Sequence, residues 1–295
     1  MRIGVVGSIN MDLTITVSRL PNKGETVVGN KVQYVPGGKG ANQAVSMARL
    51  GANVLMFGCV GLDDFGNRLI DNLKANGVNG DFVKKIEGVD TGMAFITVGE
   101  EDNMLVVVSG ANGYVTKEYV GEIMSKLLTC DLIVLQHEIS LEVVEYVVSI
   151  CHEHNIKTIL NPAPAFPVSV ETIDKLTYLT PNEHEAALIF GEEQDTTELL
   201  LKYPEKLIVT KGEKGVITAL ETGEILEVPA RKAKVVDTTG AGDTLNGAFA
   251  FRIVEGDEIA EALRYANVAA SLSVEKFGAQ GGMPSHEEVT KEMAR

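Results

Sequence analysis

The segment Asp237-Thr238-Thr239-Gly240-Ala241-Gly242-Asp243-Thr244 is the part of this 295-residue chain that most restricts its fold. It precedes an apolar stretch that we predict to be a helix, and its small residues expose consecutive backbone N–H groups at the start of that helix. Such a helix N-terminus attracts phosphate groups. An N-cap aspartate after a flexible turn is the alternative, but a cap needs one such residue, not two aspartates, three threonines and two glycines.

Asp243 stands where a carboxylate can act on a bound substrate. The exposed N–H groups can stabilise the charge that builds on a phosphoryl group during its transfer. A carboxylate beside them can accept the proton of an attacking hydroxyl group. We therefore predict phosphoryl transfer with Asp243 as the catalytic base.

Strand and helix patterns alternate along most of the chain. Short apolar runs predict strands at residues 3–9, 53–60, 131–135, 157–160, 207–210 and 215–220. Amphipathic stretches predict helices at residues 41–50, 65–76, 116–128, 140–154, 241–254 and 259–277. Thr116 and Ser140 are expected N-caps, and Gly51 and Gly77 expected helix ends. This alternation predicts an α/β fold: a mainly parallel central sheet with helices on both faces, and ligands beyond the carboxyl ends of its strands.

Four further strands do not fit this alternation. Residues 13–17, 27–35, 93–98 and 104–108 alternate between apolar and polar side chains, which is typical of strands with one exposed face. The last two flank the turn Gly99-Glu100-Glu101-Asp102-Asn103. We expect one kinase domain over residues 1–295, with a small β-sheet lid inserted at about residues 12–36 and 91–109.

The overall charge excludes some classes of partner. The chain has 26 lysines and arginines against 41 aspartates and glutamates, a formal net charge of −15. An acidic surface repels phosphate backbones, so we expect neither nucleic acid nor membrane partners. ATP is also an anion, so an ATP site here requires a local positive field from backbone N–H groups or bound cations.

The cysteines and apolar runs favour a cytoplasmic protein. Cys59, Cys130 and Cys151 are odd in number and lie in apolar runs, which favours buried reduced thiols over a redox pair or metal site. No run of 18 apolar residues is present, and the first residues are typical of a core strand rather than a signal peptide.

A second glycine-rich motif is Gly37-Gly38-Lys39-Gly40-Ala41-Asn42-Gln43-Ala44, which enters a predicted helix. It lacks the spacing of a Walker A loop. Its glycines let the backbone approach a ligand closely, with Lys39 and Asn42 directed at hydroxyl groups or a phosphate. A glycine-rich turn with a solvated Lys39 is an equally good interpretation of the motif alone.

Two shorter motifs and one strand end are candidates for binding. In Thr180-Pro181-Asn182-Glu183-His184-Glu185, an amide and a carboxylate three residues apart suit hydrated Mg²⁺, although a helix capping box fits the spacing better. The turn Thr210-Lys211-Gly212-Glu213-Lys214-Gly215 suits a nucleotide or an ordinary hairpin. Glu138 follows an apolar strand, whereas the adjacent His137 is expected to be structural.

Together these motifs resemble the ribokinase branch of the phosphofructokinase-B-type carbohydrate kinases, over nearly the whole chain. The matching stretches also include Gly7-Ser8-Ile9-Asn10-Met11-Asp12, Gln136-His137-Glu138 and Gly278-Ala279-Gln280. The resemblance implies a ribokinase-like fold and ATP-dependent phosphorylation of D-ribose at its 5-hydroxyl, giving D-ribose 5-phosphate and ADP.

The resemblance also implies the members of each site. The sugar contacts are Asn10, Asp12, Gly38, Lys39, Asn42, Glu138 and the base Asp243. The anion hole consists of Gly240, Ala241 and Gly242. The ATP contacts are Asn182, Thr210, Gly212, Gly215, Gly242 and Asn267.

Two metal ions and a homodimer are further implications. Glu185 matches an acidic residue linked to Mg²⁺. A monovalent cation such as K⁺ is expected to activate the enzyme, with ligands, mostly carbonyl groups, from Asp237, Thr239, Ser273, Lys276 and Gly278. Gly282 stands where related kinases often carry a serine near that cation, so one side-chain ligand is missing. The lid strands of the family pair between subunits, which implies the homodimer.

Three other functions compete with this one. A kinase of another small sugar, such as deoxyribose or fructose, or of a nucleoside fits the same fold, although the Lys39 motif favours ribose. A sugar-binding protein without catalysis has no need of Asp243. A dinucleotide oxidoreductase is disfavoured, because the glycine fingerprint is absent.

Overall fold

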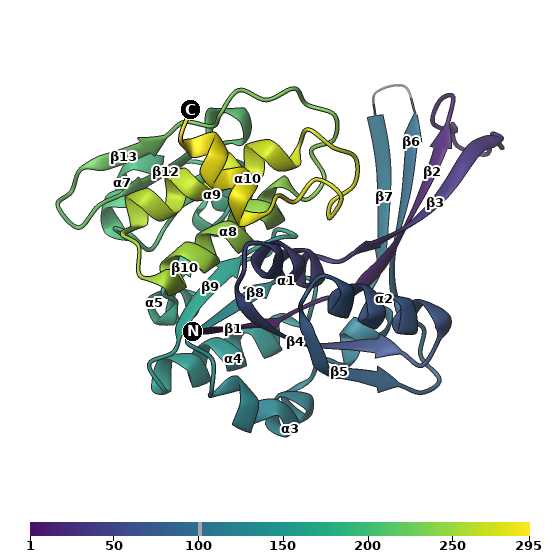
Figure 1. Cartoon of the computed structure of the whole chain (residues 1–295), viewed down its shortest axis with the longest axis horizontal. Helices are drawn as coiled ribbons and strands as arrows, with labels where there is room; N and C mark the ends of the chain where they lie inside the picture. Colours follow the sequence, from purple (N-terminus) through teal and green to yellow (C-terminus); the bar gives the residue numbers. More distant parts are fainter. Residues whose placement is uncertain (100–101) are drawn as a thin grey trace.

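Six parallel strands form the central sheet of the computed structural model, which describes residues 1–99 and 102–295 (Figure 1). The strand order is β10-β9-β8-β1-β4-β5. The bounds are β1 (Arg2–Val6), β4 (Asn53–Gly61), β5 (Asn79–Ile86), β8 (Leu132–Gln136), β9 (Lys157–Asn161) and β10 (Tyr178–Leu179). The predicted parallel sheet is confirmed, and its strands β5 and β10 are two that the sequence patterns did not predict.

Both faces of this sheet are apolar, which explains why helices cover each of them. In β1, Ile3 and Val5 belong to one hydrophobic core and Val6 to the other; in β4, Met56 and Phe57 divide in the same way. Successive side chains of a strand point to opposite faces, so both faces must be buried. The first core is covered by α1 (Lys39–Arg49), α2 (Asp64–Ala75), α8 (Ala241–Glu255), α9 (Ile259–Ser273) and α10 (His286–Met293). The second is covered by α3 (Lys117–Leu127), α4 (Leu141–Glu153), α5 (Val170–Lys175), α6 (Glu183–Phe190) and α7 (Thr196–Lys202).

A small antiparallel sheet continues the central sheet beyond β10. It consists of β11 (Val209–Thr210), β12 (Val216–Ala219) and β13 (Ile225–Val228), with the single turn η2 (Gly212–Lys214) between the first two. Parallel bridges from Leu179 to Leu207 and from Asn182 to Thr210 join it to the β10 edge. The strands predicted at residues 207–210 and 215–220 therefore lie beside the parallel sheet rather than in it.

The predicted lid strands form a separate four-stranded sheet that stands away from the main body in Figure 1. Its order is β3-β2-β6-β7, and its bounds are β2 (Asn10–Val17), β3 (Gly29–Gly37), β6 (Gly92–Gly99) and β7 (Asp102–Val108). The short helix η1 (Gly110–Tyr114) follows β7. Residues 100 and 101 of the predicted turn lie outside the described residues.

Two local predictions are wrong in detail. The helix predicted to reach residue 277 ends at Ser273. The carbonyl of Val274 instead accepts the N–H groups of Val236 and Asp237, at 2.8 and 3.2 Å, so the chain leaves the helix to join the segment before α8. Ser140 precedes α4 without a side-chain capping bond, whereas Thr116 caps α3 as predicted.

The three cysteines are buried, as the sequence predicts. All three thiols are buried and unpaired, and burial raises the pKa of each to about 12. Among the described residues, the helices are too short or too polar to span a membrane.

Candidate active site

Asp243 lies in the first turn of α8, buried at the carboxyl edge of the central sheet and 6% exposed. The helix begins after Gly240, whose φ of +78° is a conformation that favours glycine. A Cβ atom at this position would approach the Cα of Ala279 to 2.8 Å. Glycine thus lets the N-terminus of α8 pack directly against the loop that follows α9.

The start of α8 offers free N–H groups, as the sequence predicts. Within the described chain, the N–H groups of Gly242 and Asp243 have no acceptor. The N–H of Ala241 donates to the carbonyl of Thr238 at 3.2 Å. Of the three predicted anion-hole residues, Gly242 therefore presents a free donor, whereas that of Ala241 is engaged. The orphan donors and the helix dipole together favour an anion at this point.

Two amides of α1 hold the carboxylate of Asp243. Asn42 Nδ2 donates to Oδ2 at 2.9 Å, and Gln43 Nε2 donates to Oδ1 at 3.0 Å. Gln43 is fully buried and accepts a bond from Gln136 Nε2 at 2.7 Å through its own oxygen. Sequence reasoning missed Gln43 as a functional residue, although it is the direct neighbour of Asn42 in the glycine-rich motif.

Asn42 also links Asp243 to the loop after α9 and, through it, to helix α2. Its Oδ1 accepts a bond from Gln280 Nε2 at 3.0 Å, and the Oε1 of Gln280 accepts one from Asn72 Nδ2 at 2.8 Å. The amide of Asn42 therefore orients Asp243 in addition to any contact with a sugar.

The predicted sugar residues converge on the same edge of the sheet. Glu138 Oε2 accepts bonds from Ser8 Oγ at 2.6 Å and from the backbone N–H of Lys39 at 3.0 Å. Gly38, with φ +86°, lies so close to β2 that a Cβ atom would be 2.7 Å from the backbone nitrogen of Asn10. The glycines of the motif thus bring the start of α1 against the junction of β1 and β2.

The charges in this group influence one another. Burial, followed by the negative charges of Glu138 and Asp243, raises the pKa of Asp12 to about 7, against the opposing effect of Lys39. Burial lowers the pKa of Lys39, but the carboxylates of Asp243, Glu138, Glu185 and Asp12 outweigh it and raise that pKa above its ordinary value. The site is a cluster of carboxylates around one ammonium group.

The predicted ATP and Mg²⁺ residues lie in conventional local structures. Asn182 and Glu185 form a capping box with two bonds of 2.8 Å, so the capping interpretation is confirmed. Burial raises the pKa of Glu185, although the Asn182 N–H, Lys39 and His184 oppose this. No cluster of three or more His, Cys, Asp or Glu among the described residues suits a metal ion. An Mg²⁺ ion here would depend mainly on phosphate and water oxygens, which it accepts readily.

The predicted ATP contacts Thr210, Gly212 and Gly215 lie in a hairpin that packs on β13. The turn is closed by a 2.7 Å bond from the Lys211 N–H to the Gly215 carbonyl, with Thr210 and Gly212 beside it. Gly215 has φ +94° and packs against the carbonyl of Val228, to which the buried Asn267 donates at 2.7 Å. The fold thus brings Gly215 and Asn267 together.

The predicted cation ligands lie in two adjoining segments. The carboxylate of Asp237 accepts the N–H groups of Thr239 and Gly278, each at 2.9 Å. Ser273 Oγ donates a hydrogen bond to the Ala270 carbonyl. Lys276 Nζ lies 3.7 Å from Glu288 Oε1. A Cβ atom at Gly282 would collide with the carbonyl oxygen of Ser273, so a serine does not fit there without a shift of the loop.

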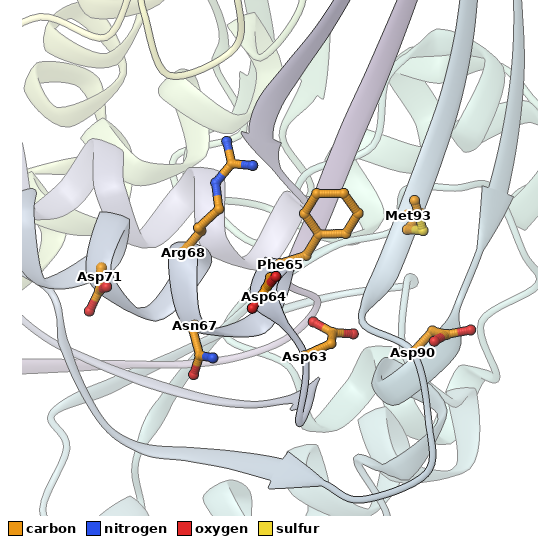
Figure 2. A pocket seen from close by; sticks show the side chains of 8 residues that line it. All are labelled: Asp63, Asp64, Phe65, Asn67, Arg68, Asp71, Asp90 and Met93. Atoms are coloured by element: carbon orange, nitrogen blue, oxygen red, sulfur yellow. The ribbon is translucent and has the colours of Figure 1, made fainter.

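A hollow of about 790 Å³ lies on the face of the four-stranded sheet that does not carry Asp12 (Figure 2). Strand register puts Asn10, Asp12, Gly92 and Ala94 on one face, here called the Asp12 face. The other is here called the Phe95 face. It carries Leu13, Ile15, Val32, Tyr34, Met93, Phe95, Met104, Val106 and Val108. Met93 lines the hollow, and so does Phe65. The centroid of the Phe65 ring lies 5.7 Å from that of the Tyr34 ring. The hollow is therefore separate from the site around Asp243.

The chain belongs to the pfkB family of carbohydrate kinases, whose family model matches residues 2–286. It is 50% identical over 287 residues to the ribokinase of Bacillus subtilis (strain 168), covering 97% of each chain. The crystal structure of ribokinase from Thermotoga maritima matches with a TM-score of 0.91, at 36% identity and 99% coverage of both chains. The Arabidopsis thaliana ribokinase complexed with ribose and ATP matches with a TM-score of 0.90, at 31% identity over 98% of this chain and 97% of that one.

The raised pKa of Asp12 predicts that its charge destabilises the fold in the absence of ligand. An acid whose folded pKa is about 7, against 3.8 ordinarily, costs stability progressively as the pH rises from about 4 to 7. Asp12→Asn should therefore raise the melting temperature clearly at pH 8 and less at pH 5, by about 2–4 °C for each kcal/mol relieved. Thermal unfolding at both pH values checks this, with the exposed Asp81→Asn as control. An equal effect of Asp12→Asn at both pH values would contradict it.

Proposed function

We propose that this protein is a ribokinase, which transfers the γ-phosphoryl group of ATP to the 5-hydroxyl of D-ribose and yields D-ribose 5-phosphate and ADP. The observation that carries the proposal is the buried carboxylate of Asp243, held by two amides beside free N–H groups at a helix N-terminus. The identity to the Bacillus subtilis ribokinase and the likeness to a ribokinase complexed with ribose and ATP support it.

The sugar would lie between the Asp12 face and the start of α1. The carboxylates of Asp12 and Glu138 would accept hydrogen bonds from sugar hydroxyls, while Lys39 and Asn10 would donate hydrogen bonds to hydroxyl oxygens. Asn42 and the backbone of Gly38 complete the proposed sugar contacts. Since a pocket with fixed donors and acceptors rejects a sugar that lacks a matching hydroxyl, this set would give specificity.

Asp243 would take the proton of the 5-hydroxyl as that oxygen attacks the γ-phosphorus. The P–O bond to ADP breaks as the new bond forms, and the electron pair leaves with ADP. Within the predicted anion hole of Gly240, Ala241 and Gly242, the free N–H of Gly242 would hold the charge on the phosphoryl oxygens. The contribution of this chain is thus orientation and charge stabilisation rather than covalent chemistry.

ATP would lie across the loops that lead into and out of the small antiparallel sheet. Its proposed contacts are Asn182, Thr210, Gly212, Gly215, Gly242 and Asn267. Mg²⁺ would neutralise charge on the phosphates, and Glu185 would hold it through water because one carboxylate oxygen is already engaged with Asn182. The carbonyl groups of Thr239, Ser273, Lys276 and Gly278, with Asp237, would hold an activating K⁺ beside the anion hole.

The four-stranded sheet would act as a lid over the sugar. Beyond Asp12, the Asp12 face carries apolar side chains from β6 and β7, including Ala94, Ile96 and Val107. An apolar cover excludes water from the transferring phosphoryl group and limits wasteful hydrolysis of ATP. The buried unpaired thiols suit a reducing compartment, and we assign the protein to the cytoplasm.

A turnover panel with ATP and Mg²⁺ tests the substrate. We expect kcat/KM to be highest for D-ribose, ahead of deoxyribose, fructose and adenosine, because the site offers charged and amide partners for several hydroxyls. Coupled detection of ADP measures each rate. A higher kcat/KM for deoxyribose, fructose or adenosine would replace ribose with that substrate, and absence of turnover with all four would exclude the kinase assignment.

We also propose a homodimer through the Phe95 face. Val32, Tyr34, Phe95, Met104, Val106 and Val108 are 39–60% exposed and form a continuous apolar surface on this face. Apolar surfaces of this kind mark protein–protein contacts. A second copy of the same face is the proposed partner, since it offers an equally apolar and equally twisted sheet.

Charge on the Phe95 face should dissociate the dimer. Val106→Lys places an ammonium group on an edge strand where the residue is 60% exposed, so the isolated subunit should tolerate it. We expect the wild type to have about twice the 31.6 kDa mass of one chain by analytical ultracentrifugation, and the variant to have the single mass. Val170→Lys on α5, also exposed, is the control. A monomeric wild type or a dimeric Val106→Lys would contradict the proposal.

A further inference from the structure

Asn112 lies in η1, directly after the lid strand β7, and its side chain is 1% exposed. Its Oδ1 accepts the backbone N–H of Ile9 at 2.9 Å, and its Nδ2 donates to Oδ1 of Asn10 at 2.6 Å. Asn112 thus bonds directly to the side chain of the proposed sugar contact Asn10. It belongs to none of the motifs that the sequence analysis singled out.

These bonds fix which atom of Asn10 faces the sugar. A backbone N–H can only donate, so the Asn112 atom that meets Ile9 must be the oxygen. The NH₂ group of Asn112 then points to Asn10 and requires an oxygen there. The NH₂ group of Asn10 is left for the Asp12 face, and it has no acceptor among the described residues.

The direction of this amide matters because hydrogen-bond donors are scarce in the site. The carboxylates of Asp12, Glu138 and Asp243 are all hydrogen-bond acceptors, and Asn42 already donates to Asp243. A sugar hydroxyl can donate only one hydrogen bond, and once it donates to a carboxylate its oxygen still needs a hydrogen-bond donor. Lys39 and Asn10 are the side chains placed to supply one.

Asn10 and Asn112 lie at the base of the four-stranded sheet, where strands β2 and β6 begin. Gly92, at the start of β6, packs so closely on the pair that a Cβ atom would collide with the Asn112 amide nitrogen. The preceding Thr91 is held by Asp63, which accepts its N–H and its hydroxyl at 2.7 Å each. The orientation of Asn10 is therefore set by residues at the base of the lid.

We propose that Asn112 is a positioning residue for the sugar: it fixes the NH₂ group of Asn10 toward the substrate and ties that donor to the base of the lid. The proposal rests on the proposed function, because it takes Asn10 as a sugar contact. Asn112 itself does not touch the sugar.

The nearly isosteric Asn112→Asp variant tests this directly. It keeps an acceptor for Ile9 but replaces the NH₂ group with a second acceptor, so Asn10 must turn and present its oxygen to the sugar. We expect the KM for ribose to rise roughly 10- to 100-fold, the range for a mispaired buried group, with kcat within about 3-fold and the KM for ATP unchanged. The exposed Asn79→Asp on β5 is the matched control.

A double-variant cycle separates positioning from a merely structural role. If Asn112 acts through Asn10, then Asn112→Asp should add no further increase in KM once Asn10→Ala is present. The side chain of Asn112→Ser is too short to reach Asn10, so this variant should raise the KM for ribose less than Asn112→Asp does. It replaces Asn112→Asp in the test if the aspartate variant fails to fold. Thermal unfolding of each variant reports stability separately.

The outcomes distinguish this proposal from the function on which it rests. A ribose KM unchanged in Asn112→Asp, or KM increases that multiply in the double variant, would overturn the positioning role while leaving the kinase assignment intact. An unchanged KM in Asn10→Ala would remove the sugar contact and the positioning role with it. A wild type that does not phosphorylate ribose would overturn both the proposed function and this inference.

Discussion

The two amide bonds to the carboxylate of Asp243 are the interaction on which the rest of the structure depends. They join residues 200 and 201 positions apart, Gln43 and Asn42 on α1 to Asp243 on α8. A buried carboxylate without such partners would be costly, so the two helices must lie close together. Gly247 permits this approach, because a Cβ atom there would be 2.6 Å from the hydroxyl oxygen of Ser46. The carboxylate of Asp243 is thereby positioned by the packing of the core.

A buried network of polar side chains extends this constraint along the edge of the sheet. Gln136 at the end of β8 and Asn161 at the end of β9 both bond to Gln43, at 2.7 and 3.1 Å. Thr180 bonds to Asn246 of α8 at 2.6 Å. Three of the central strands, β8, β9 and β10, therefore end on or beside a group in this network, and the site needs little reorganisation when charge develops. The proposed sugar, phosphate and cation residues surround this network.

Sequence patterns predicted the elements whose signals are local. The central strands are apolar on both faces, and residues 237–244 carry the chemistry of a helix N-terminus. The strand β5 was missed because two consecutive exposed residues, Lys84 and Lys85, interrupt its alternation of buried and exposed side chains. Gln43 and Asn112 were missed as functional residues for a different reason: their partners lie about 100 to 200 residues away, and a polar side chain alone does not reveal them. The end of α9 was misplaced because a bond from Val236, also distant in sequence, decides it.

The most direct test of this account is the turnover of Asp243→Asn with ATP, Mg²⁺ and D-ribose. The variant keeps the size and shape of the side chain, so circular dichroism should show an unchanged fold. If Asp243 is the base, kcat should fall by about 10²–10⁴, the contribution of a positioned base, while Asp81→Asn retains normal turnover. A folded Asp243→Asn enzyme with kcat within about 3-fold of the wild type would contradict the role of this carboxylate as the base.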